Sequence, residues 1–171
     1  RGTRVRRARP HVSDVQRCRG QRRYQHMRHK AAASNSPLRL HRLDAAAASD
    51  GVCLDGSPPA YFYAPGNGSA WLVFLKGGGW CMDAEACRYR STMREGTTLH
   101  LPSELAMGGL LSADPAVNPT FHAFHRAYLW YCDGSMFTGA REAPLVVANM
   151  TIFLRGRRVL DALLRALLER G

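Results

Sequence analysis

The 171-residue sequence lacks several features that define common classes of protein. It has no apolar run of 18 residues, which a membrane-spanning helix needs, and no apolar segment typical of a signal peptide. It has no pair of cysteines separated by two residues, and His100, His122 and His125 do not have the spacing of zinc ligands. It also has no Gly-x-Ser-x-Gly turn, which carries the nucleophile of many serine hydrolases. No internal repeat is present.

Acidic residues are almost absent from the first quarter of the chain. Residues 1–43 contain 13 Lys and Arg but only one acidic residue, Asp14, whereas residues 44–171 contain 11 basic and 12 acidic residues. The formal charge of +11 therefore belongs to residues 1–43. We expect these residues to form a basic disordered arm, because they have no apolar periodicity. Since the first methionine is Met27, a non-native extension is the alternative.

The basic arm leaves a polyanion-binding function open, because Lys and Arg bind polyanions through charge alone. Nucleic acid is an unlikely partner, since only Tyr24 in the arm offers a ring for base stacking and no recognition module is present.

Four cysteines follow the arm, and four cysteines allow three pairings. We favour one local bridge and one long-range bridge, with four reduced, buried thiols as the alternative. The sequence also contains two N-glycosylation acceptor motifs, which matter only in a secreted protein. The favoured bridges are Cys81–Cys87 and Cys53–Cys132, and the motifs begin at Asn67 and Asn149.

From residue 44 onward the pattern predicts an α/β fold. The apolar segments 52–54 and 60–63 flank Asp-Gly and Pro-Pro turn signals and predict a β-hairpin. The continuous apolar runs 71–75 and 127–132 predict strands buried on both faces of a parallel sheet. Residues 83–100 are polar and weakly helical.

An amphipathic helix is predicted over residues 157–169, with Val159, Leu160, Leu163 and Leu164 among the residues on its apolar face. Such a helix would normally cover a sheet and lead into another parallel strand. In this chain we expect its apolar face to remain partly uncovered.

Three consecutive glycines follow the first buried strand, in the segment Lys76-Gly77-Gly78-Gly79-Trp80-Cys81. Glycine lets backbone N–H groups approach a ligand without a Cβ in the way. A glycine-rich turn at this position in α/β-hydrolases donates to the oxyanion that forms during acyl transfer. A tight turn between strand and loop is the alternative interpretation.

Several motifs together resemble plant pectin acetylesterases, in the family that also includes the Wnt deacylase Notum. The resemblance covers roughly residues 50–171. The motifs are 52–61 (VCLDGSPPAY), 75–81 (LKGGGWC), 109–112 (GLLS) with Asn118-Pro119, 131–135 (YCDGS) and 155–158 (RGRR).

This resemblance implies a partial α/β-hydrolase-like, doubly wound sheet that stops before the nucleophile strand. It implies a secreted cell-wall enzyme that removes acetyl groups from pectin with a Ser/Asp/His triad, without cofactor or metal. The nucleophile is expected in a Gly-x-Ser-Ala-Gly-Gly turn on the strand after the helix at 157–169. Residues 44–171 then form the N-terminal part of the hydrolase domain, which we expect to be inactive alone.

The resemblance assigns roles to four residues. Gly77 and Gly78 are expected to form the oxyanion hole, and Gly79 and Trp80 to contact the substrate, acetylated pectin. Asp133 follows the strand predicted at 127–132, where ligands bind in open α/β sheets, so it is a further candidate for substrate binding, with a capping or turn role as the favoured alternative. The family usually has Glu where this chain has Lys76, and this reversed charge either alters the support of the loop or points to solvent. A non-catalytic, truncated protein that binds pectin or a partner is the alternative function.

Ser57 and Ser135 each follow a glycine in a turn, as nucleophiles often do. Neither lies in a strand-turn-helix segment, so turn formation is the favoured role. His122 and His125 are expected to have surface or packing roles.

Overall fold

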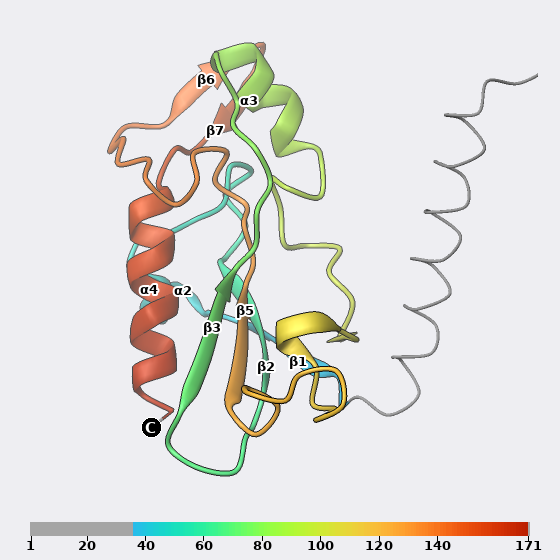
Figure 1. Cartoon of the computed structure of the whole chain (residues 1–171). Coiled ribbons are helices and arrows are strands. Elements are labelled where there is room, and N and C mark those ends of the chain that lie inside the picture. The colour runs from blue at the N-terminus through green and yellow to red at the C-terminus, as the bar shows by residue number, and fades with distance from the viewer. Residues whose placement is uncertain (1–35, 171) are drawn as a thin grey trace, which may run out of the picture.

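The computed structural model describes residues 36–170, which form a mixed five-stranded sheet with the strand order β3-β5-β2-β1-β4 (Figure 1). β3 is parallel to β5, whereas β2 is antiparallel to both β5 and β1, and β1 is antiparallel to β4. The strands are β1 (Leu38–Arg42), β2 (Ala60–Ala64), β3 (Trp71–Leu75), β4 (Glu104–Leu105) and β5 (His125–Leu129).

Helix α4 (Gly156–Leu168) covers one face of this sheet, with the short helix α2 (Ala45–Ala48) beside it (Figure 1). The predicted helix at 157–169 is therefore confirmed. Its side chains Val159, Ala162, Leu163 and Leu167 are buried against Leu129 and neighbouring sheet residues. Fully burying one such aliphatic side chain contributes about 1.5–3 kcal/mol. The apolar face is mostly covered by the sheet, and Leu164 and Leu168 on the helix remain exposed, as expected for a partly uncovered face.

The opposite face of the sheet is covered by irregular chain in the described residues. Phe62 and Trp130 on this face pack with Leu101 and Leu111, which come from the long connection between α3 (Ala84–Ser91) and β5. This connection includes β4 and one 3-10 turn, η1 (Gly109–Leu111).

A two-stranded sheet, β6 (Leu145–Val147) and β7 (Met150–Ile152), packs against α3 beyond the upper ends of β3 and β5 in Figure 1. The carboxyl ends of the two parallel strands thus lie beneath a small separate layer.

Two predictions about strands were wrong. Segment 52–54 forms no hairpin with β2, because both edges of β2 are occupied by β1 and β5. Its Leu54 N–H instead donates to the Cys132 carbonyl at 2.9 Å. β3 is a strand, as predicted, but it lies at the sheet edge and is not buried on both faces, since Phe74 is 38% and Leu75 is 46% exposed.

The predicted limit of the basic arm also needs correction. Leu38–Arg42 form β1, which pairs with β2 through a register that places Leu40 opposite Phe62. The alternating side chains of β1 contribute to the core, and Leu38 is fully buried. The rest of the predicted arm, residues 1–35, lies outside the described residues.

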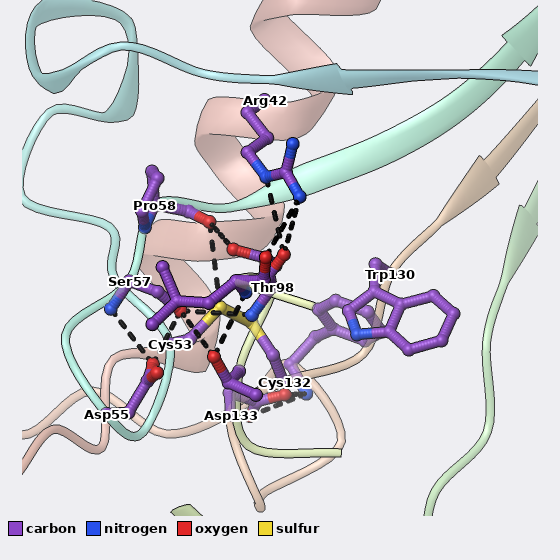
Figure 2. Close-up of a disulfide and its surroundings, with 12 residues drawn as sticks. Arg42, Cys53, Asp55, Ser57, Pro58, Thr98, Trp130, Cys132 and Asp133 are labelled. Atoms are coloured by element: carbon purple, nitrogen blue, oxygen red, sulfur yellow. Dashed lines mark hydrogen bonds between the residues drawn. A yellow bond between two sulfur atoms is a disulfide. The ribbon is translucent and has the colours of Figure 1, made fainter. Parts of the chain in front are cut away.

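Both favoured disulfides, Cys53–Cys132 and Cys81–Cys87, are present. Figure 2 shows Cys53–Cys132 next to the Ser57 and Thr98 side chains. The Ser57 hydroxyl accepts from the Thr98 N–H at 3.1 Å, and the Thr98 hydroxyl donates to the Pro58 carbonyl at 2.7 Å. The bridge and these bonds hold the turn at 53–58 against the end of β5.

Candidate active site

The glycine segment 76–81 forms a loop at the carboxyl end of β3, and both of its ends are fixed by backbone hydrogen bonds. The Lys76 N–H donates to the Leu129 carbonyl at 3.0 Å, and the Cys81 N–H donates to the Gly134 carbonyl at 3.0 Å. Both acceptors belong to β5 or the turn that follows it. The loop is thereby attached to the neighbouring parallel strand at two points.

Side chains hold all four carbonyls between these anchors. Lys76 Nζ donates to the Gly77 carbonyl at 3.0 Å. Arg90 donates to the Gly78 carbonyl at 2.6 Å through Nη1 and to the Trp80 carbonyl at 3.3 Å through Nη2. The Tyr131 hydroxyl donates to the Gly79 carbonyl.

The N–H groups of the same four residues have no hydrogen-bond acceptor among residues 36–170. Gly77, Gly79 and Trp80 are exposed and Gly78 is half-buried, so these donors are available to a ligand. Backbone N–H groups without a protein acceptor can bind an anion. The donors to the four carbonyls fix the backbone of the loop, so its N–H groups are held in place before a ligand binds.

The structure requires glycine at two of the three positions. A Cβ on Gly78 would lie 2.0 Å from Cδ1 of Tyr131, and Gly79 has a φ of 72°, which is strained for residues with a side chain. A Cβ on Gly77 would meet no atom within 4 Å. Gly78 and Gly79 therefore set the shape of the loop, and Gly77 is free to change.

Helix α3 brings Arg90 to the loop. Asp83 caps the helix, since its Oδ1 accepts from the Ala86 N–H at 2.7 Å. The Cys81–Cys87 disulfide connects the end of the loop to the first turns of the helix. The cap and the bridge together fix the direction of α3, so that Arg90 near its end reaches back over the loop.

Lys76 points inward, and the exposed fraction of its side chain is 13%. Its ammonium group lies 3.4 Å from Glu95 Oε1 and 4.8 Å from the centre of the Trp130 ring. Burial lowers the pKa of Lys76, with Arg94 and Arg90 acting in the same direction and Glu95 opposing them. The reversed charge at this position therefore supports the loop rather than pointing to solvent.

Trp80 borders a cavity of about 400 Å³. The side chain is 54% exposed, and the same cavity is lined by Met82, Ser135, Leu145 and Leu154. An exposed indole beside a cavity offers a flat apolar wall to a sugar ring or an acyl group. Trp80, for which the resemblance implies contact with the substrate, therefore lines a cavity.

Asp133 is not among the residues that line this cavity. The residue is fully buried, and its carboxylate accepts from the Ser135 N–H at 3.1 Å and the Phe137 N–H at 3.0 Å. Burial raises the pKa of Asp133, and hydrogen bonds, chiefly from the Ser135 hydroxyl, oppose the shift. Asp133 therefore organises the turn that follows β5.

No serine hydroxyl is hydrogen-bonded to a histidine within residues 36–170. The Ser135 hydroxyl donates to Asp133, and the Ser57 hydroxyl donates to Asp55 at 2.5 Å. His125 contacts the Tyr63 hydroxyl at 2.7 Å, and His122 contacts the Pro119 carbonyl at 3.3 Å. The described residues therefore contain no serine activated by a histidine.

In this structure a glycine-rich loop follows the edge strand of a mixed sheet, as glycine-rich loops follow a strand in α/β-hydrolases. The structure is similar to the Wnt deacylase Notum from Drosophila, with a TM-score of 0.71 and 26% identity over 80% of this chain and 39% of that one. The predicted fold class is confirmed.

The chain belongs to the pectinacetylesterase family, whose sequence model matches residues 31–171. It is 39% identical to pectin acetylesterase 11 of Arabidopsis thaliana over 132 residues, which are 75% of this chain and 33% of that protein. It is 32% identical to human palmitoleoyl-protein carboxylesterase NOTUM over 140 residues, which are 80% of this chain and 27% of that protein. The chain thus spans about a third of the length of the curated relatives it matches. The match begins at residue 31, earlier than the resemblance predicted from the sequence.

The sequence did not reveal the side chains that hold the loop. Arg90 and Tyr131 are distant from the glycines in the chain, and no local periodicity marks them. The only signal was the family difference at position 76, which drew attention to Lys76 without showing its contacts.

Proposed function

We propose that the full-length protein is a carboxylic ester hydrolase that removes acetyl groups from pectin, and that the loop at 77–80 is its oxyanion hole. The observation that carries this proposal is the different state of the N–H groups and carbonyls of residues 77–80. The four N–H groups have no acceptor among residues 36–170, whereas all four carbonyls accept a hydrogen bond from a side chain. An ester carbonyl that gains negative charge on attack would accept from these N–H groups.

The four donors include the expected residues Gly77 and Gly78, and the geometry adds Gly79 and Trp80. The Trp80 ring and the adjacent cavity would receive the sugar or the acetyl group. The name of the Arabidopsis relatives supports acetyl esters of pectin as substrates, and the chain is more similar in sequence to these relatives than to human NOTUM.

We infer that the nucleophile lies on a strand that follows α4 and pairs with the outer edge of β3. This edge has no partner in the described part of the chain, and Phe74 and Leu75 are exposed there. Helix α4 follows β5 and covers one face of the sheet, so a strand after α4 would run parallel to β5. The edge strand β3 is itself parallel to β5 and could pair with such a strand. A turn at the carboxyl end of that strand would lie beside the loop at 77–80.

The proposed enzyme is secreted to the cell wall. Two disulfides favour an oxidising compartment. No helix among residues 36–170 is long and apolar enough to cross a membrane.

The test uses the full-length protein with acetylated pectin, and the measurement is acetate release. A palmitoleoylated peptide is the comparison substrate, because the Notum relatives are named for that activity. We expect acetate release and little deacylation of the peptide. Release of palmitoleate with no release of acetate would reject the pectin substrate, while leaving ester hydrolysis in place.

The nucleophile is tested with a fluorophosphonate. The hydroxyl oxygen of a reactive serine bonds to the phosphorus of this reagent, and fluoride leaves. Mass spectrometry of the labelled protein identifies the serine. We expect a label beyond residue 171 and none at Ser57 or Ser135. A label at Ser135 would contradict the inferred position of the nucleophile.

A further inference from the structure

A second cavity, of about 650 Å³, lies at the other end of the sheet from the loop at 77–80. Its lining includes Arg39, Tyr63, Asn67, Glu104, His122 and Arg126. β5 begins at His125, and Tyr131, which contacts the glycine loop, lies just beyond its other end (Figure 1). Five residues of extended chain separate Arg126 from Tyr131, or about 16 Å.

Arg126 has an unusual environment for a charged residue. It is 2% exposed, and Nη1 donates to the Leu111 carbonyl at 2.8 Å. Nε is buried and has no hydrogen-bond partner in the described part of the chain. Burial lowers the pKa of Arg126, and no charged side chain offsets this effect among residues 36–170.

The other charges of the cavity are already paired. Arg39 lies 3.6 Å from Glu104, the only acidic residue in the described lining. This pair leaves the Arg126 guanidinium as the uncompensated charge. A buried cation without a counter-charge is costly, and an anion bound in the cavity would remove much of that cost.

We propose that this cavity binds a carboxylate of an acidic saccharide, with Arg126 as the principal charged contact. A guanidinium offers paired N–H donors that match the two oxygens of a carboxylate. The choice of a uronate rests on the proposed function, because pectin is a polymer of uronic acids. A polymer longer than the separation of the two sites would contact both, so the cavity would anchor the substrate away from the reacting ester.

The first test measures binding of trigalacturonate to the full-length protein by calorimetry, with the neutral trisaccharide maltotriose as the control ligand. We expect binding of the acidic saccharide and none of the neutral one. Arg126→Met should weaken the binding by about tenfold or more, because a charge-assisted contact is lost. Equal binding of the two saccharides would overturn the proposal.

Arg126→Met can also disturb folding, so a second variant tests the same cavity without changing Arg126. Glu104→Gln removes the acidic residue of the lining and should tighten trigalacturonate binding by about two- to fivefold, because it releases Arg39 and removes a repulsive charge. Asp161→Asn is the matched control, since Asp161 is a similarly exposed acidic partner of Arg157 on α4. Equal effects of these two variants would show that only net charge matters and would overturn the proposal.

Esterase kinetics separate this proposal from the proposed function. We expect Glu104→Gln to lower KM for acetylated pectin and Asp161→Asn to leave this KM unchanged. If the wild-type protein hydrolyses acetyl esters but does not bind trigalacturonate, the carboxylate site is rejected and the esterase function is retained. If it binds trigalacturonate but releases no acetate, the esterase function fails while the carboxylate site stands.

Discussion

Two adjacent glycines in the loop should respond in opposite ways to the same substitution. Gly78→Ala would place a Cβ 2.0 Å from the Tyr131 ring, whereas Gly77→Ala would place it in open space. The Tyr131 ring is fully buried and lies 5.5 Å from the Phe137 ring, so it has little room to move. The loop backbone must therefore shift in Gly78→Ala.

The expected cost of Gly78→Ala follows from this contact. Forcing an extra methyl group into a packed site destabilises a protein by about 1–3 kcal/mol. Gly77 has no positive φ, so alanine there should be neutral or stabilising by about 0.4–1 kcal/mol, because it restricts the unfolded chain. Urea unfolding of the full-length variants measures this difference from the transition midpoints.

The same pair tests the oxyanion hole. Loss of one well-placed donor lowers kcat by about 10²–10³ in acyl-transfer enzymes. A shifted loop in Gly78→Ala should lower kcat for acetyl esters at least tenfold, while Gly77→Ala retains most of the activity. Equal stability and equal kcat in the two variants would refute the close packing of Gly78 on Tyr131 and its role in shaping the loop.

Three further predictions concern the supports of the site and of the sheet. Arg90→Met should lower kcat through loss of the donors to Gly78 and Trp80, while Arg88→Met on the same helix should not, as acetate release will show. Removing Cys53–Cys132 should destabilise the fold by about 4.5 kcal/mol and removing Cys81–Cys87 by about 2.3 kcal/mol, because the loops closed differ in length; urea unfolding of the paired Cys→Ser variants measures both. Burial, and then Arg170, lower the pKa of His41 from its ordinary value of 6.5. Because His41 binds a proton more readily in the unfolded chain than in the folded protein, its contribution to the free energy of unfolding should fall as the pH drops below about 6.5. His41→Phe should abolish this contribution to the pH dependence of thermal unfolding.

Features with a local signature were predicted well from the sequence. The helix α4 has the 3.6-residue periodicity of an amphipathic segment, and β3 is a continuous apolar run that ends at the glycines. The Cys81–Cys87 bridge closes a short loop, which made that pairing a natural choice among the three.

Features that depend on strand order were not predicted. Turn signals at 55–59 favoured a hairpin, but the partners of β2 are β1, which precedes segment 52–54, and β5, which lies far away along the chain. β1 was missed because Leu38 and Leu40 alternate with the charged and polar residues of a strongly basic segment. Arg126 attracted no attention, since its burial depends on the chain that packs over β5.

The contacts that hold the glycine loop all come from one part of the chain. Every side chain that holds a carbonyl of the loop lies between Lys76 and Tyr131. The anchors at Leu129 and Gly134 and the Cys81–Cys87 bridge lie in the same part of the chain. The orientation of the four N–H groups therefore does not depend on the strand that we infer beside β3. Such a loop would be arranged before the nucleophile meets the ester, which is the condition under which fixed donors lower the barrier most effectively.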